Sequence, residues 1–180
     1  MKIVDRISHA WDAFKGSEPL QNKYDIGPAI SHKSDRRIFT ITNEQTIMAS
    51  IISRIANDVA SVNIVHCKLD KDGRYLEDVN SGLNECLTTS ANIDQTGREF
   101  IRDVTASMLD EGVVAIVPID TSTSPINYNS YDIYSMRVGQ IITWYPEHVM
   151  VKVYNEKTGF KEDIVLPKSM VAIVENPFYA

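Results

Sequence analysis

Residues 83–120, LNECLTTSANIDQTGREFIRDVTASMLDEGVVAIVPID, decide the fold that this chain is expected to adopt. Thr96 and Glu99 have the spacing of a capping box, which marks the start of a helix. Gly112 suits the left-handed residue that commonly ends a helix, and residues 113–117, VVAIV, predict a buried strand. Between these signals, apolar residues recur at intervals of three and four, as on one face of a helix: Phe100, Ile101, Val104, Met108 and Leu109. We therefore expect this helix and this strand to pack together as one unit, with Phe100 in the core.

The composition is that of a folded domain. The chain has 180 residues, of which 43% are hydrophobic and 23% are charged, so a substantial core is expected. The formal net charge of −6 argues against non-specific electrostatic binding to nucleic acid, which requires clustered Lys and Arg. Cys67 and Cys86 are too few for a disulfide framework or a four-cysteine zinc site, so a reducing compartment is expected. The sequence has neither the ~18 apolar residues of a membrane span nor the pattern of a signal peptide, and no membrane partner is expected.

Residues 1–42 are predicted to form an N-terminal amphipathic helix and a linker. The helix is expected over residues 3–15, and residues 16–37 have the Gly, Pro, Ser and charged composition of a linker. Large apolar residues fall on one face of this helix, here called the N-terminal stripe: Ile3, Ile7, Trp11 and Phe14. This stripe is expected to dock either on its own domain or on a neighbouring subunit.

Residues 43–180 are predicted to form one α+β domain, in which helices and a hairpin precede a mostly antiparallel β-rich half. Thr42 and Gln45 form a second capping box, and the helix after it carries apolar residues at four-residue spacing. These residues are Ile47, Ile51, Ile55 and Val59, reinforced by Met48 and Ile52. A strand over residues 61–69 and the turn DKDG at residues 70–73 predict a hairpin, and a short helix is expected over residues 79–87.

The β-rich half is predicted from short apolar runs that are separated by turn residues. The sequence NEKTG at residues 155–159 is typical of a hairpin turn. Strands are expected over residues 131–137, 140–144, 149–154, 160–166 and 171–174.

No motif for covalent chemistry, nucleotide binding or metal binding is present. The four histidines are scattered, and His66 and Cys67 are neighbours on a predicted strand, so their side chains would point to opposite faces. No GxGxxG, GxSxG or phosphate-binding loop occurs. We expect no catalytic residue, metal or cofactor, and a structural role. The enzymatic alternative is a site assembled from His66, His148 and distant carboxylates.

From residue 43 onward the sequence resembles the N-terminal half of the portal proteins of tailed bacteriophages. The resemblance rests on the order of the elements and on short stretches of sequence. These are IANDVAS at 55–61, LTTSANIDQTGREFI at 87–101, LDEG at 109–112, VVAIVP at 113–118 and YPEHV at 145–149. The chain departs from the family pattern at residues 91–93, which read Ala-Asn-Ile where the family has Pro-Asn, and at residues 112–114, which read Gly-Val-Val where it has Gly-Asn-Ala.

The resemblance implies a non-enzymatic subunit of a dodecameric portal ring at a capsid vertex of the virion, assembled in the host cytoplasm. Portal rings work with scaffold and capsid protein, dock the terminase and the head–tail connector, and let double-stranded DNA pass without reading its sequence. Residues 43–180 would form a wing-like domain, and the chain is expected to be truncated before the clip, stem and crown. The N-terminal stripe is then a candidate for one half of the subunit contact. The alternatives are another non-enzymatic head or tail connector component, or a generic protein-interaction domain.

Overall fold

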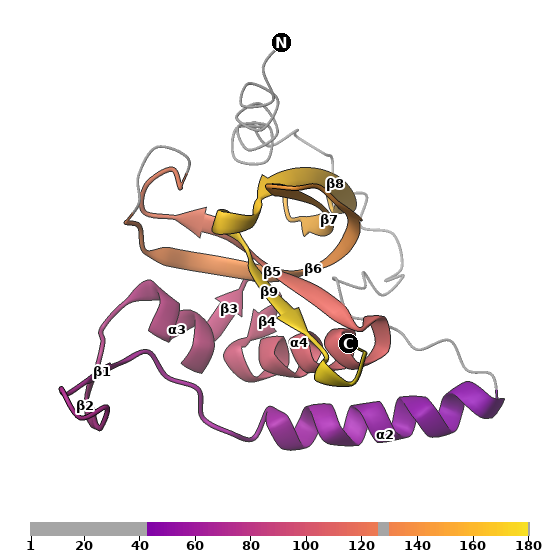
Figure 1. Cartoon of the computed structure of the whole chain (residues 1–180), viewed down its shortest axis with the longest axis horizontal. Helices are drawn as coiled ribbons and strands as arrows, with labels where there is room; N and C mark the ends of the chain where they lie inside the picture. The colour runs from indigo at the N-terminus through magenta and orange to yellow at the C-terminus, as the bar shows by residue number, and fades with distance from the viewer. Residues whose placement is uncertain (1–42, 126–129, 180) are drawn as a thin grey trace, which may run out of the picture.

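Helices occupy the first half of the domain and a five-stranded antiparallel sheet the second, which confirms the predicted α+β class (Figure 1). The computed structural model describes residues 43–125 and 130–179. The helical half comprises α2 (Asn43–Val59), β1 (Cys67–Leu69), β2 (Tyr75–Asp78), α3 (Gly82–Thr88), β3 (Ser90–Asn92), β4 (Gln95–Thr96) and α4 (Gly97–Glu111). The sheet comprises β5 (Val113–Thr121), β6 (Ile133–Trp144), β7 (His148–Asn155), β8 (Phe160–Pro167) and β9 (Ala172–Glu175) in the order β8-β7-β6-β5-β9, with 3-10 turns at Lys168–Met170 and Pro177–Tyr179.

The central helix and strand form as the sequence predicts. The Thr96 hydroxyl accepts a hydrogen bond from the Glu99 backbone N–H at 3.2 Å, and the Glu99 carboxylate accepts one from the Thr96 N–H at 3.1 Å. Gly112 ends α4 with φ of 83°, and β5 begins at the next residue. Phe100 and Val104 of α4 pack in one cluster with Val114 of β5, so the predicted helix–strand unit is confirmed.

Strand β5 is buried on both faces of the sheet, which explains its unbroken apolar sequence. Because side chains alternate along a strand, Val114 points to one face and Ala115 to the other. The first face packs against α3 and α4 through Cys86, Ala91, Phe100, Val104, Val114 and Met136. The second face is filled mainly by strand residues: Ala115, Val117, Val149, Val151, Val153, Ile164 and Leu166.

One strand, β6, replaces the two strands predicted over residues 131–137 and 140–144, so that prediction was wrong. It pairs with β5 through residues 133–139 and with β7 through residues 140–144. Gly139 lies where the pairing partner changes, and a Cβ atom there would be 2.3 Å from Val151 Cγ1. The glycine therefore permits the close approach of β7. From the sequence alone, a glycine in this role cannot be distinguished from a glycine in a turn.

The predicted strand over residues 61–69 was also mostly wrong, because only Cys67–Leu69 is a strand. Residues 62–65 form no ladder with another described strand, and their branched side chains are exposed. The hairpin itself is confirmed: β1 and β2 are antiparallel, and the Asp70 N–H donates to the Arg74 carbonyl at 2.9 Å. The helix expected over residues 79–87 is α3, which begins after Ser81, and the hairpin turn at residues 155–159 joins β7 to β8.

Candidate functional site

Helix α2 presents a line of apolar side chains that the rest of the described structure leaves uncovered. The predicted helix is confirmed, but it packs on α4 through Ile52 and Ala56, which contact Ala106 and Leu109. The residues at four-residue spacing lie beside this buried line and are exposed, and so is Met48, which precedes Ile52 by one turn on the line that α4 covers further along; the exposed fractions lie between 38% and 67%. We call this exposed set the α2 stripe: Ile47, Met48, Ile51, Ile55 and Val59.

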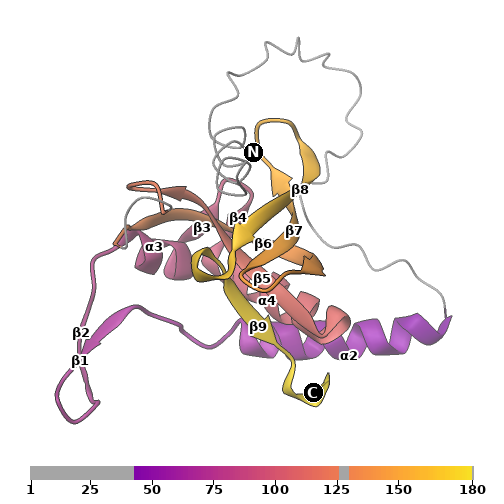
Figure 2. The ribbon, with the colours of Figure 1, turned by 45° about the horizontal axis from the view of Figure 1, so that its top comes forward.

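The geometry of an α-helix explains why the stripe is exposed. A step of four residues turns the helix by about 400°, so a line of such residues drifts by about 40° per step around the axis. Two such lines run along α2, and α4 covers only the one that carries Ile52 and Ala56. Figures 1 and 2 show α2 on the side of α4 away from the sheet, with the first part of α2 extending beyond α4. The α2 stripe therefore lies at an outer edge of the domain.

Exposed apolar side chains continue beyond the end of α2. Val62, Ile64 and Val65 are exposed, and they line a groove of about 430 Å³. Leu87 of α3 and Ile101 of α4 also line this groove, together with polar residues such as Arg98. The β1–β2 hairpin adds further exposed apolar residues, which are Leu69, Tyr75 and Leu76. Extended exposed apolar surface of this kind is typical of protein-interaction sites and ligand-binding grooves.

The hairpin is anchored at its base and projects from the domain (Figure 2). The His66 N–H donates to the Asn84 side-chain oxygen at 3.0 Å, and His66 Nδ1 lies 2.8 Å from the Ser81 hydroxyl. Asp132 accepts the Gly82 N–H at 2.8 Å, and this bond is the main reason that the pKa of the Asp132 carboxyl lies below its ordinary value. The start of α3 thus fixes the base of the hairpin, while the apolar side chains of the hairpin stay exposed.

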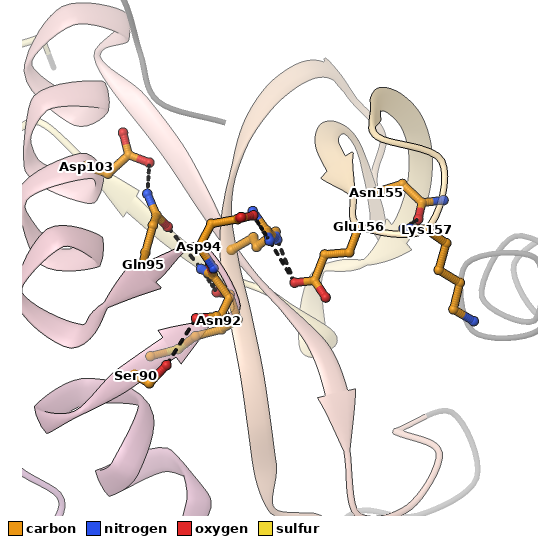
Figure 3. A network of polar contacts seen from close by, with 10 residues as sticks. Ser90, Asn92, Asp94, Gln95, Asp103, Asn155, Glu156 and Lys157 are labelled. Atoms are coloured by element: carbon orange, nitrogen blue, oxygen red, sulfur yellow. Dashed lines mark hydrogen bonds and ion pairs between the residues drawn. The ribbon is translucent and has the colours of Figure 1, made fainter. Parts of the chain in front are cut away.

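A buried cation joins the helical half to the sheet. Arg137 on β6 is 0% exposed, and its Nη2 donates to Asp94 at 2.5 Å and to Glu156 at 2.7 Å. Its guanidinium also lies 4.9 Å from the centroid of the Tyr154 ring. Burial lowers the pKa of Arg137, but the hydrogen bonds with the two carboxylates outweigh burial and hold the pKa above its ordinary value. In Figure 3, Asp94 and Glu156 reach the network from opposite sides.

Amide side chains extend this network into the helical half (Figure 3). Asn92 donates to the Gln95 side chain and to the Met136 carbonyl, each at 3.0 Å. Gln95 in turn donates to Asp103 of α4 at 3.1 Å. Buried donors and acceptors that bond each other in this way fix the relative position of the segments that carry them. The arrangement is a clamp between β3, β4, α4 and β6.

The structure tests the remaining sequence predictions unequally. The N-terminal stripe, Ile3, Ile7, Trp11 and Phe14, lies outside the described residues, as does Thr42 of the second capping box. His66 is bonded at the start of α3, whereas His148 is the first residue of β7. Within residues 43–125 and 130–179, no three His, Cys, Asp or Glu side chains are grouped as a metal ion would require. No helix in that part of the chain has the length and apolar composition to cross a bilayer.

Sequence reasoning missed two of these features. The signal for the α2 stripe was the presence of two apolar lines in one helix, since a single partner helix covers only one of them. The signal for the polar network was Arg137, a charged residue between Met136 and Val138 in an otherwise apolar part of β6. Comparisons of the sequence with protein-family models and with curated proteins give no match.

Proposed function

We propose that this chain is a structural subunit of the portal ring at the capsid vertex of a tailed bacteriophage. The observation that carries the proposal is the uncovered apolar surface formed by the α2 stripe, residues 62–65 and the β1–β2 hairpin. A ring subunit needs such a surface, because each copy must bury part of itself against the next. In a ring, one face of a subunit contacts a different face of its neighbour.

The internal architecture supports a role as a rigid block. The buried Arg137 binds a carboxylate from the helical half and one from the sheet, so these contacts help the domain to keep its shape when neighbours press on it. The net charge of −6 also suits a conduit, since strong binding to DNA phosphates would hinder the passage of DNA. In this role the chain acts with terminase, scaffold, capsid and connector proteins, and it carries out no catalysis itself.

Ring formation by the full chain tests the proposal. We expect light scattering to give a mass that is a multiple of the 20.3 kDa chain and negative-stain images to show annular particles. Particles without a central channel would favour the alternative of another head or tail connector component. A monomer at every concentration and salt condition would contradict the proposal.

The N-terminal stripe supplies a mutational test of the same proposal. Replacing Trp11 by Ala should weaken each subunit contact by ~2 kcal/mol or more, which is about 30-fold in affinity, because buried tryptophans dominate interfaces. Far-UV circular dichroism should be unchanged. Trp144, which is half exposed on β6, provides the matched control, and Trp144→Ala should leave the oligomeric mass unaltered. Equal masses for Trp11→Ala and wild type would exclude Trp11 from the contact.

A further inference from the structure

We infer that the α2 stripe receives the N-terminal stripe of a neighbouring copy, so that these two surfaces are the complementary halves of the subunit contact. This inference rests on the proposed ring function and adds the partner of a specific surface. Its starting point is that α2 is packed on one side only, while five large apolar side chains beside that contact remain exposed. A helix covered along one line has room for a second helix along the other.

The dimensions of the two stripes match. From Ile47 to Val59 the α2 stripe is about 18 Å long, at 1.5 Å per residue. From Ile3 to Phe14 the stripe of the predicted helix would be about 16 Å long on the same basis. Both are built on residues three or four apart, which form the ridges that interdigitate when helices pack. One helix of this length would cover the whole α2 stripe.

The side chains of the two stripes are also complementary. The α2 stripe is aliphatic apart from Met48, whose flexible thioether adapts well to aromatic rings. The N-terminal stripe brings Trp11 and Phe14, the kind of side chain that anchors an interface when it enters an apolar groove. Arg54 and Asp58 form an exposed ion pair at 3.1 Å on α2, and they provide a polar rim next to the stripe.

The connection between the two surfaces allows contact between copies. Residues 16–42 separate the predicted helix from α2, and 27 residues span at most about 90 Å when extended. The predicted helix can therefore reach an adjacent subunit. In a ring, each copy would give its N-terminal stripe to one neighbour and receive that of the other on α2, which is the head-to-tail pattern that closes a ring. Docking within one chain would occupy both halves and leave neither for the ring.

Complementation between two full-length variants tests this arrangement. Trp11→Asp damages the donor half and Ile51→Asp damages the acceptor half, and each variant alone should be monomeric by light scattering. A 1:1 mixture should form a heterodimer of twice the 20.3 kDa chain mass and nothing larger, because only one intact donor and one intact acceptor can meet. Asn57→Asp places the same charge on an exposed position of α2 outside the stripe, and this control should assemble like wild type.

A binding measurement separates failure of the docking from failure of the ring. A dye-labelled peptide of residues 1–17 should raise its fluorescence anisotropy on adding the full-length Trp11→Asp chain. The affinity should fall about tenfold or more when Ile51→Asp is added to that chain. Ile47→Asp, at the most exposed position of the stripe, serves as a second acceptor variant if Ile51→Asp does not fold, as judged by circular dichroism.

The outcomes divide clearly. Rings that persist with both acceptor variants, or a mixture that stays monomeric while wild type assembles, would overturn the inference and leave the proposed function standing. Failure of wild type to form rings would overturn the proposed function, and the contact between neighbours with it. If the acceptor variants bound the peptide with unchanged affinity, the N-terminal stripe would dock elsewhere, and the inference would be overturned.

Discussion

Replacing Phe100 by Ala removes the largest apolar side chain that is completely buried in the described structure. The ring lies between α4 and the sheet, in contact with the cluster of Cys86, Val104 and Met136. Losing its burial costs ~1.5–3 kcal/mol in transfer free energy. The cavity adds ~24 cal/mol per Å³, and it cannot collapse far, because β5 and β6 are held from their other face as well. We therefore expect a loss of ~3–5 kcal/mol in the free energy of unfolding.

Urea denaturation and thermal melting, each followed by far-UV circular dichroism, measure this loss. For a domain of this size a loss of 1 kcal/mol lowers Tm by about 2–4 °C, so Phe100→Ala should melt about 6–20 °C below wild type. Phe160→Ala is the matched control, because Phe160 is 74% exposed on β8 and its loss should change stability by no more than ~0.5 kcal/mol. If the two variants melted at the same temperature, Phe100 would not be in the core and the pairing of α4 with β5 would be wrong.

Two further predictions concern titratable groups. The pKa of Asp132 is lowered in the folded state by the Gly82 N–H, so its contribution to stability is present above the unfolded pKa of ~3.9 and is lost as the pH falls through the lower, folded pKa. Asp132→Asn should therefore have a lower urea midpoint than wild type at pH 7, and the gap should narrow by pH 2; a gap that is independent of pH would contradict this. Burial raises the pKa of Cys86 to about 11 from 9.0, which lowers its thiolate fraction at pH 8 about 100-fold. The stronger nucleophilicity of such a thiolate offsets roughly tenfold of this, so the buried Cys86 should react with Ellman's reagent at least about tenfold more slowly than the half-buried Cys67. A single fast phase that titrates both thiols would show that Cys86 is accessible.

The parts of the fold that could be predicted from the sequence are those with local signals. The capping box at Thr96 and Glu99, the glycine at 112 and the apolar run after it lie within about 20 residues, and each acts on its immediate neighbours. The helix–strand unit was therefore predicted correctly. The hairpin turns at residues 70–73 and 155–159 were found for the same reason.

The parts that were missed depend on distant partners. In the sequence, Gly139 suggests a turn between two strands. In the structure, Val151 of β7 occupies the space that a side chain at residue 139 would need. Residues 61–66 have the branched composition of a strand, but no described strand pairs with them. The exposure of the α2 stripe likewise follows from where Ala106 and Leu109 of α4 touch α2, which periodicity within α2 cannot specify.

The candidate site was predicted even less completely. The N-terminal stripe was identified from its spacing, and it stays a prediction because it lies outside the described residues. The groove beside residues 62–65 does not follow from the sequence, because the branched residues of that segment predict a strand. Arg137 was not singled out, since its partners lie 43 residues before it and 19 residues after it.

The position of Arg137 has a mechanical consequence for the domain. Asp94 in the turn between β3 and β4 and Glu156 in the turn after β7 both bind Arg137 of β6. Neither turn can therefore move relative to β6 without separating a carboxylate from a cation that water does not reach. Leaving such a buried cation without its partners is strongly destabilising. These three segments should therefore move together as one unit. A domain tied together in this way would suit the proposed ring subunit, which has to keep its shape against two neighbours.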